Sequence, residues 1–167
     1  MSHTDMKKMT VTAIFIAIGV LLSPVLSFPF GGARVFPLQH LINVLLAVLI
    51  GWRYSTAGAF CISSIRIAMG MGTVMAYPGS MIGAALSGLA YQKTHSIWGA
   101  VAGEIIGTGI IGGLISYPIA AFVLDSKAVA FYFFVVAFLP NTCIGAACAA
   151  VLYKILPIQK LKDELLK

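Results

Sequence analysis

Residues 128–153 read AVAFYFFVVAFLPNTCIGAACAAVLY and contain no charged side chain. Two further stretches, 9–33 and 67–92, are also free of charge. Each is longer than the ~20 residues that an α-helix needs to cross the hydrocarbon core of a bilayer. None alternates between apolar and polar residues as a membrane β-strand does. Backbone groups in lipid must be hydrogen-bonded within their own segment, so these stretches predict transmembrane helices.

The composition of the whole chain agrees with this prediction. Its 167 residues include only 11 Lys and Arg and 5 Asp and Glu, and 60% are hydrophobic. A soluble domain carries roughly 25% charged residues, which it needs to cover its surface. A soluble enzyme, a disordered chain and a free nucleic-acid-binding protein are therefore excluded. The first apolar stretch follows Lys7 and Lys8 but is too long for a cleaved signal peptide, and further apolar stretches follow it.

Proline and glycine residues divide the apolar stretches into six predicted transmembrane helices. The predicted fold is therefore all-α, an integral membrane bundle of six transmembrane helices. We expect one membrane domain over residues 1–167. A loop rich in turn-forming residues is expected at about 27–37, and Pro37 suits the first position of the next helix. The tail 160–167 is expected to form an interfacial or frayed helix. The predicted helices cover about 8–26, 37–51, 54–70, 78–91, 95–123 and 128–155.

The distribution of basic residues predicts the orientation of the bundle, because cytoplasmic loops carry an excess of Lys and Arg. With both termini in the cytoplasm, the outer side holds only Arg34 and Lys127. The net charge of +6 then indicates contact with anionic lipid headgroups and not with nucleic acid. The inner side holds Lys7, Lys8, Arg53, Lys93, Lys154, Lys160, Lys162 and Lys167.

Two ionisable residues fall inside predicted spans, where a charge costs a few kcal/mol unless it has a partner or a function. Glu104 lies about nine residues into the fifth predicted helix, near the membrane midplane, and Arg66 lies toward the outer end of the third. Both are candidates for a polar pocket that faces the substrate. The alternative is a structural ion pair, or an arginine that reaches the interface along its aliphatic stem.

The start of the second predicted helix carries three polar side chains, Gln39, His40 and Asn43. Their spacings of three and four residues place them on one helix face. Beside the aromatic, glycine-rich outer loop, this face is a candidate rim of a binding site. An interfacial position without a ligand is the alternative.

Three more residues are candidates for ligand contact, Asn141 near the middle of the sixth predicted helix, and Tyr77 and Tyr117 on the outer side. Asn141 follows Pro140, which removes a backbone donor and kinks the sixth helix, so its amide is either a ligand contact or a helix-packing group. Tyr77 and Tyr117 are either a platform for a flat heteroaromatic ligand or part of the aromatic belt of a membrane protein.

Small residues recur at four-residue spacing on two predicted helices, at Gly79, Gly83 and Ser87 and at Gly99, Gly103 and Gly107. Such stripes let helix backbones approach closely, so we expect them to pack the fourth helix against the fifth. The sequence has no GxxxxGK[ST] phosphate loop, no HExxH or Cys/His metal spacing and no GxSxG motif. We therefore expect no enzymatic activity, no cofactor and no bound metal.

Several segments resemble the substrate-binding (S) components of energy-coupling-factor (ECF) vitamin transporters, in particular the thiazole-related ThiW branch. They are GGARVFPLQHLIN at 31–43, YPGSMIGA at 77–84 and GEIIGTG at 103–109. The similarity extends over nearly the whole chain, from the first predicted helix to the sixth.

The resemblance implies a multi-pass protein of the prokaryotic cell membrane that binds a vitamin precursor near the outer surface. The implied ligand is hydroxyethylthiazole, the thiazole precursor of thiamine. The implied partners are a transmembrane coupling subunit and two cytoplasmic ATPases. In such proteins an Ala-x-x-x-Ala patch on the first helix contacts the coupling subunit, and Ala13 and Ala17 match that patch. The outer loop at 27–37 would act as a lid.

Two other classes of function stay open from the sequence. One is a solitary proton-coupled carrier that uses Glu104 as its proton site. The other is an assembly or anchor protein held in place by its small-residue stripes.

Overall fold

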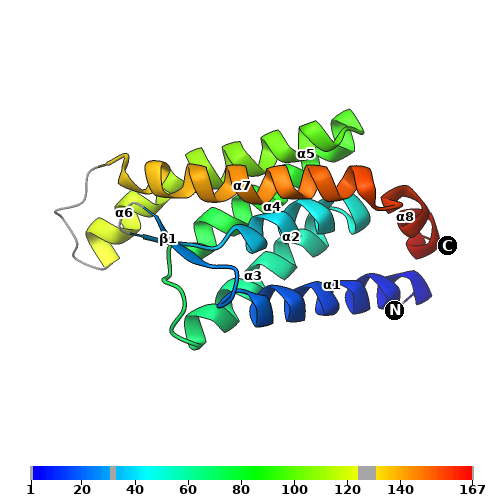
Figure 1. Ribbon diagram of the computed structural model, residues 1–167, viewed down its shortest axis with the longest axis horizontal. Coiled ribbons are helices and arrows are strands. Elements are labelled where there is room, and N and C mark those ends of the chain that lie inside the picture. The colour runs from blue at the N-terminus through cyan, green and yellow to red at the C-terminus, as the bar shows by residue number, and fades with distance from the viewer. Residues whose placement is uncertain (1, 31–32, 124–130, 167) are drawn as a thin grey trace.

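The computed structural model describes residues 2–30, 33–123 and 131–166. These residues form an all-α bundle with one short hairpin, and the helices run side by side along one long axis with both termini at the same end (Figure 1). Seven helices are present in the described part when α5, η1 and α6 are counted as one. The elements are α1 (His3–Leu22), β1 (Phe28–Phe30), β2 (Ala33–Val35), α2 (Pro37–Ile50), α3 (Trp52–Ala68), α4 (Ala76–Thr94), α5 (Ile97–Glu104), η1 (Ile105–Gly112), α6 (Gly113–Val123), α7 (Phe133–Ile155) and α8 (Ile158–Leu166).

The first helix begins and ends earlier than the predicted range 8–26. Ser2 caps α1, because its Oγ accepts from the backbone N–H of Asp5 (3.1 Å) and its own N–H donates to the Asp5 carboxylate (3.3 Å). This reciprocal capping box satisfies donors that a helix start leaves open, so the helix begins at His3. The predicted loop at 27–37 contains an antiparallel hairpin, in which Phe28 pairs with Val35.

The predicted helix 95–123 is one continuous helix with an irregular middle. Its first part is α5, its last part is α6, and η1 between them is a π-helix, a wider turn that often occurs at functional sites. The predicted range 128–155 corresponds to α7, which begins at Phe133, and residues 128–130 lie outside the described residues. The tail forms α8, which buries Ile158.

Helix α2 is the core of the bundle. Nearly all of its residues are buried, and it contacts α1, α3, α4, α5, α7 and α8. A helix that is apolar on all sides is stable only when other helices surround it. The polar residues that α2 carries are therefore held inside the protein.

The glycine stripes pack α4 against α5 and η1, as the sequence predicts. A Cβ added to Gly107 would lie 2.6 Å from the Cα of Gly83, and one added to Gly112 would lie 2.5 Å from the Cα of Gly79. Only residues without a side chain allow two backbones to approach so closely. This contact brings η1 beside the start of α4, where the pocket described below lies.

Two helices of the described part are long and apolar enough to cross a membrane. They are Ile97–Phe122, with 26 residues, and Phe133–Ile155, with 23 residues. The helix Pro37–Ile50 is apolar but shorter, and it is the buried centre of the bundle.

Candidate functional site

A pocket of about 480 Å³ opens among the start of α2, the end of α3, the α3–α4 loop, the start of α4, η1 and the start of α7. These segments lie toward the end of the bundle away from the two termini (Figure 1). Its volume is within the range of about 300–1,000 Å³ that is typical of small-molecule sites. The lining residues are Phe36, Gln39, His40, Arg66, Gly70, Met71, Gly72, Thr73, Met75, Ala76, Gly79, Ser80, Thr108, Phe133, Phe134, Ala137, Phe138 and Asn141.

One side of the pocket is polar and is built around Arg66, which is only 4% exposed. Its Nη1 donates to Oε1 of Gln39, and its Nη2 donates to the backbone carbonyl of Met71 (3.3 Å). The guanidinium carbon lies 3.6 Å from the ring centroid of Phe36, in a cation–π contact. Gln39 is held in turn, because its Nε2 donates to Oγ of Ser63 (2.8 Å). The cation is therefore fixed in position before any ligand arrives.

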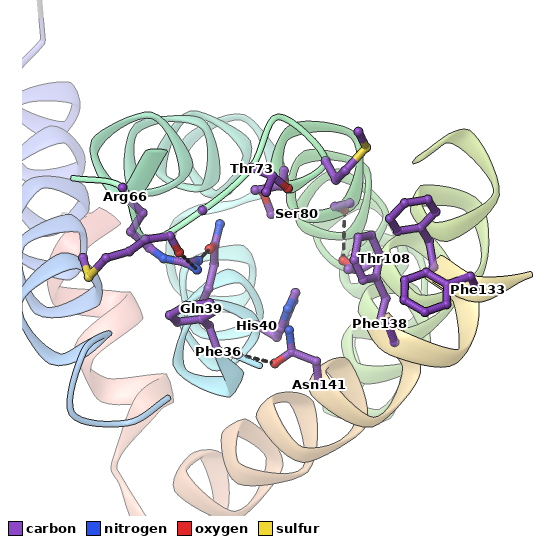
Figure 2. A pocket seen from close by; sticks show the side chains of 18 residues that line it. Phe36, Gln39, His40, Arg66, Thr73, Ser80, Thr108, Phe133, Phe138 and Asn141 are labelled. Atoms are coloured by element: carbon purple, nitrogen blue, oxygen red, sulfur yellow. Dashed lines mark hydrogen bonds between the residues drawn. The ribbon is translucent and has the colours of Figure 1, made fainter. Parts of the chain in front are cut away.

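The other side of the pocket is aromatic. Phe134 lies between Phe133 and Phe138, with ring centroids 5.4 Å and 6.1 Å away. All three belong to α7, and the four-residue spacing of Phe134 and Phe138 places those two rings on one helix face. Figure 2 shows Phe133 and Phe138 across the pocket from Arg66 and Gln39. The site can thus hold a ligand with an apolar ring at one end and a polar group at the other.

His40 and Asn141 join the two sides. The side-chain oxygen of Asn141 accepts from the backbone N–H of Phe36 (2.9 Å), which ties the start of α7 to the residue before α2 (Figure 2). His40 Nδ1 lies 2.8 Å from Oε1 of Glu104. The imidazole therefore lines the pocket while its Nδ1 is engaged by a buried carboxyl group.

Glu104 lies behind this wall and is 0% exposed. Its Oε1 also lies 3.0 Å from Nδ2 of Asn43 and 3.1 Å from the hydroxyl of Thr108. A Cβ at Gly83 would lie 2.9 Å from Oε2, so the carboxyl group fits only because residue 83 is glycine. Among the described residues, nothing donates to Oε2. Within the described part of the chain, three side chains make hydrogen bonds to Oε1 and none makes one to Oε2.

The structure brings most of the predicted site residues together. Gln39, His40, Arg66 and Asn141 line the pocket, and Asn43 and Glu104 lie directly beneath it, bonded to His40 or to one another. The carboxyl group of Glu104 meets the imidazole of His40, which lies 64 positions earlier in the chain.

The two predicted tyrosines are outside the pocket lining. The hydroxyl of Tyr77 donates to Oγ of Ser64 (3.1 Å), and its ring lies 5.5 Å from that of Phe60. Tyr117 packs edge-on against Phe131 at 5.2 Å. The aromatic surface of the pocket is instead made of phenylalanines.

Sequence reasoning missed the phenylalanines and Thr108. A signal was present for the former, because the segment FYFFVVAF at 131–138 is dense in aromatic residues and leads directly to Pro140 and Asn141. Thr108 follows Glu104 by four residues, a spacing that places both on one helix face. That spacing holds in the structure, where the hydroxyl of Thr108 lies 3.1 Å from Oε1 of Glu104, so it is a signal that could have identified Thr108.

Comparison with known proteins identifies the family of the chain. Residues 9–159 match the model of the family described as thiamine-precursor transporter protein (ThiW), a range that includes every lining residue. No curated protein and no solved structure matches the chain. Because the family model covers most of the sequence, the chain belongs to the ThiW family of thiamine-precursor transporters and is a membrane transporter, not an enzyme.

Proposed function

We propose that this pocket binds the thiazole precursor of thiamine, hydroxyethylthiazole, and that the protein is the substrate-binding subunit of an ECF-type importer. One observation carries the proposal, a pocket of about 480 Å³ with a fixed cation and amide at one end and three phenylalanines at the other. A flat thiazole ring suits the aromatic end, where offset or edge-on stacking is favourable. The hydroxyl oxygen suits donors such as those of Arg66.

The small size of this ligand demands contact on all sides. It has about nine non-hydrogen atoms, so a ceiling of about −1.5 kcal/mol per atom limits its binding free energy to about −13 kcal/mol. Nanomolar affinity corresponds to about −12 kcal/mol. A ligand this small therefore reaches such affinity only if nearly every atom is in contact, with ring and hydroxyl engaged at the same time. The pocket, with its polar side and its aromatic side, can contact the hydroxyl group and the ring at the same time.

The proposal includes six membrane spans, both termini in the cytoplasm and a location in the prokaryotic cell membrane. The two long apolar helices and the concentration of Lys near the termini support it. In this orientation the pocket lies toward the outer surface, where it collects substrate. The lipid headgroups on the inner side face the basic residues.

The proposed partners are a transmembrane coupling subunit and two cytoplasmic ATPases, since the sequence lacks a phosphate-binding loop of its own. Ala13 and Ala17 are exposed on α1. Large apolar side chains beside them are exposed too, with Ile14 53% and Leu21 72% accessible. A flat patch of small residues within an apolar face suits close packing against another membrane helix.

A large side chain at this patch is expected to reduce uptake without changing the affinity for the ligand. In Ala13→Trp or Ala17→Trp, loss of about 1.4 kcal/mol of docking free energy would lower uptake by about tenfold, while ligand affinity stays at the wild-type value. Uptake of labelled precursor by cells and titration of the purified protein measure the two effects. Ala102→Trp on the exposed surface of α5 is the matched control. Equal loss of binding and uptake would contradict the assignment of the patch.

Titration of the purified protein with hydroxyethylthiazole, thiamine and the pyrimidine precursor tests the proposed substrate. We expect the thiazole to bind most tightly and to raise the melting temperature, because a ligand that binds only the folded state stabilises it. Absence of binding by all three compounds would refute the proposed function.

A matched pair of variants locates the binding event. Phe138→Ala removes a ring from the pocket and is expected to weaken thiazole binding about tenfold, as the loss of an aromatic contact worth about 1.4 kcal/mol would. Phe122→Ala removes a ring of α6 that is 85% exposed, and its affinity is expected to equal that of the wild type. Equal affinities in the two variants would place the ligand elsewhere.

A proton-coupled carrier is the second candidate, and the unpartnered Oε2 of Glu104 favours it. A buried carboxyl oxygen without a donor is a position that a proton can occupy at the least cost. Proteoliposomes that contain only this chain provide the test. Uptake driven by a proton gradient, and abolished in Glu104→Gln, would favour this candidate over the ECF importer.

A further inference from the structure

Arg66 is a buried cation whose counter-ion is missing from the described part of the chain. The acidic residues in that part are Asp5, Glu104, Asp163 and Glu164. Asp5 lies at the start of α1, and Asp163 and Glu164 lie on α8, at the end of the bundle that carries both termini (Figure 1). Glu104 is engaged by His40, Asn43 and Thr108. Among the described residues, the only close contact between a carboxyl group and a basic side chain is that of Glu104 with the imidazole of His40.

The hydrogen bonds that Arg66 makes inside the protein all go to neutral groups. They end on the amide oxygen of Gln39 and on the carbonyl of Met71, and its Nε has no partner among the described residues. A guanidinium has five N–H donors in one plane, so donors remain available on a residue that lines the pocket.

A charge in this position is costly unless something neutralises it. Guanidinium groups keep their proton in proteins, so Arg66 cannot avoid the cost by becoming neutral. Stacking on Phe36 offsets only part of the loss of water. A carboxylate or phosphate is the natural complement, because its oxygens match the fork of the guanidinium in pairs.

We propose that the ligand itself supplies this charge, so that the pocket prefers a thiazole that carries an oxyanion, a carboxylate or a phosphate, over neutral hydroxyethylthiazole. The oxyanion accepts from the N–H donors of Arg66 that the protein leaves unused, and the ring lies against the phenylalanines of α7. The neutral alcohol offers a single oxygen to the same donors and leaves the cation uncompensated. This inference rests on the proposed function, since it refines the substrate of the same pocket.

Comparative titration tests the preference. The probes are hydroxyethylthiazole, its phosphate monoester and its ring carboxylate, each added to the purified full-length protein. We expect at least one of the two anions to bind about tenfold or more tightly than the alcohol, the factor typical of a charge-assisted hydrogen bond. The arm that binds more tightly identifies the oxyanion.

Two variants assign the preference to Arg66. In Arg66→Gln the ratio of the dissociation constants of alcohol and anion is expected to fall to about one. Gln39→Glu places a carboxylate of nearly the same shape beside the guanidinium and is expected to abolish the same ratio, because the protein then supplies the counter-charge itself. The second variant keeps the test valid if the first does not fold.

The outcomes separate this inference from the function on which it rests. Tight binding of the neutral thiazole, with no advantage for either anion, would overturn the inference and leave the proposed function intact. An anion preference that persists in Arg66→Gln would also overturn it. If no thiazole binds in any form, both fail.

Discussion

Replacing Glu104 with alanine is expected to lower the free energy of unfolding by about 3–5 kcal/mol, the combined cost of unpaired buried donors and of a cavity. The variant takes away the acceptor shared by His40, Asn43 and Thr108, all of which are buried. It also leaves a cavity where the side chain was. Thermal or denaturant unfolding of the purified protein in detergent measures the effect.

Two further variants define the cause of that loss. Glu104→Gln keeps the size and one acceptor oxygen, so it is expected to be much milder than alanine, and the difference between the two measures the cost of orphaned donors rather than of lost charge. Glu164→Ala on the exposed face of α8 is the matched control for removal of an acid and is expected to change stability by about 0.5 kcal/mol or less. A Glu104→Ala protein as stable as this control would contradict the cluster.

The polar face of α2 was predictable from the sequence because it depends on local spacing. Pro37 marks the start of the helix, and positions 39, 40 and 43 must share a face in any regular helix. The glycine stripes were predictable for the same reason, since four-residue spacing on two helices matches a close packing that the structure confirms.

What could not be predicted depends on contacts between distant segments. No local sequence pattern indicates that Glu104 contacts His40. The two residues are far apart in the sequence and come together only because α5 packs against α2. The same packing divides the predicted polar residues into those that line the pocket and those that lie sealed beneath it. The phenylalanines of the pocket could not be assigned to a site from the sequence, because phenylalanine in an apolar helix is equally typical of a surface that faces lipid.

Hydrophobic periodicity also could not predict the irregular backbone around the site. The π-helix η1 widens the turn after Glu104, and a regular period of 3.6 residues carried through it places later side chains on the wrong face. The hairpin of β1 and β2 lies in a segment of turn-forming residues that predicts only a loop.

Gly107→Ala is expected to destabilise the protein by about 3 kcal/mol or more, although it adds a single methyl group. The new carbon would lie 2.6 Å from the Cα of Gly83 and 2.9 Å from the carbonyl oxygen of Ile82, both of which are backbone atoms of α4. No side-chain rotation relieves such a contact, so α4 and η1 must move apart. Unfolding of the purified variant in detergent measures the loss.

Movement of these helices is expected to damage the pocket as well, because α4 supplies Ser80 and η1 supplies Thr108 to its wall. Gly72→Ala is the matched control, since its Cβ would meet Ile67 at an ordinary 3.4 Å and its backbone is not in the left-handed region. This control is expected to change stability by about 1 kcal/mol or less, and a compatible glycine replacement in a loop is often slightly stabilising. Equal stability of the two alanine variants would show that the glycine contact between α4 and η1 is not what holds the pocket wall in place.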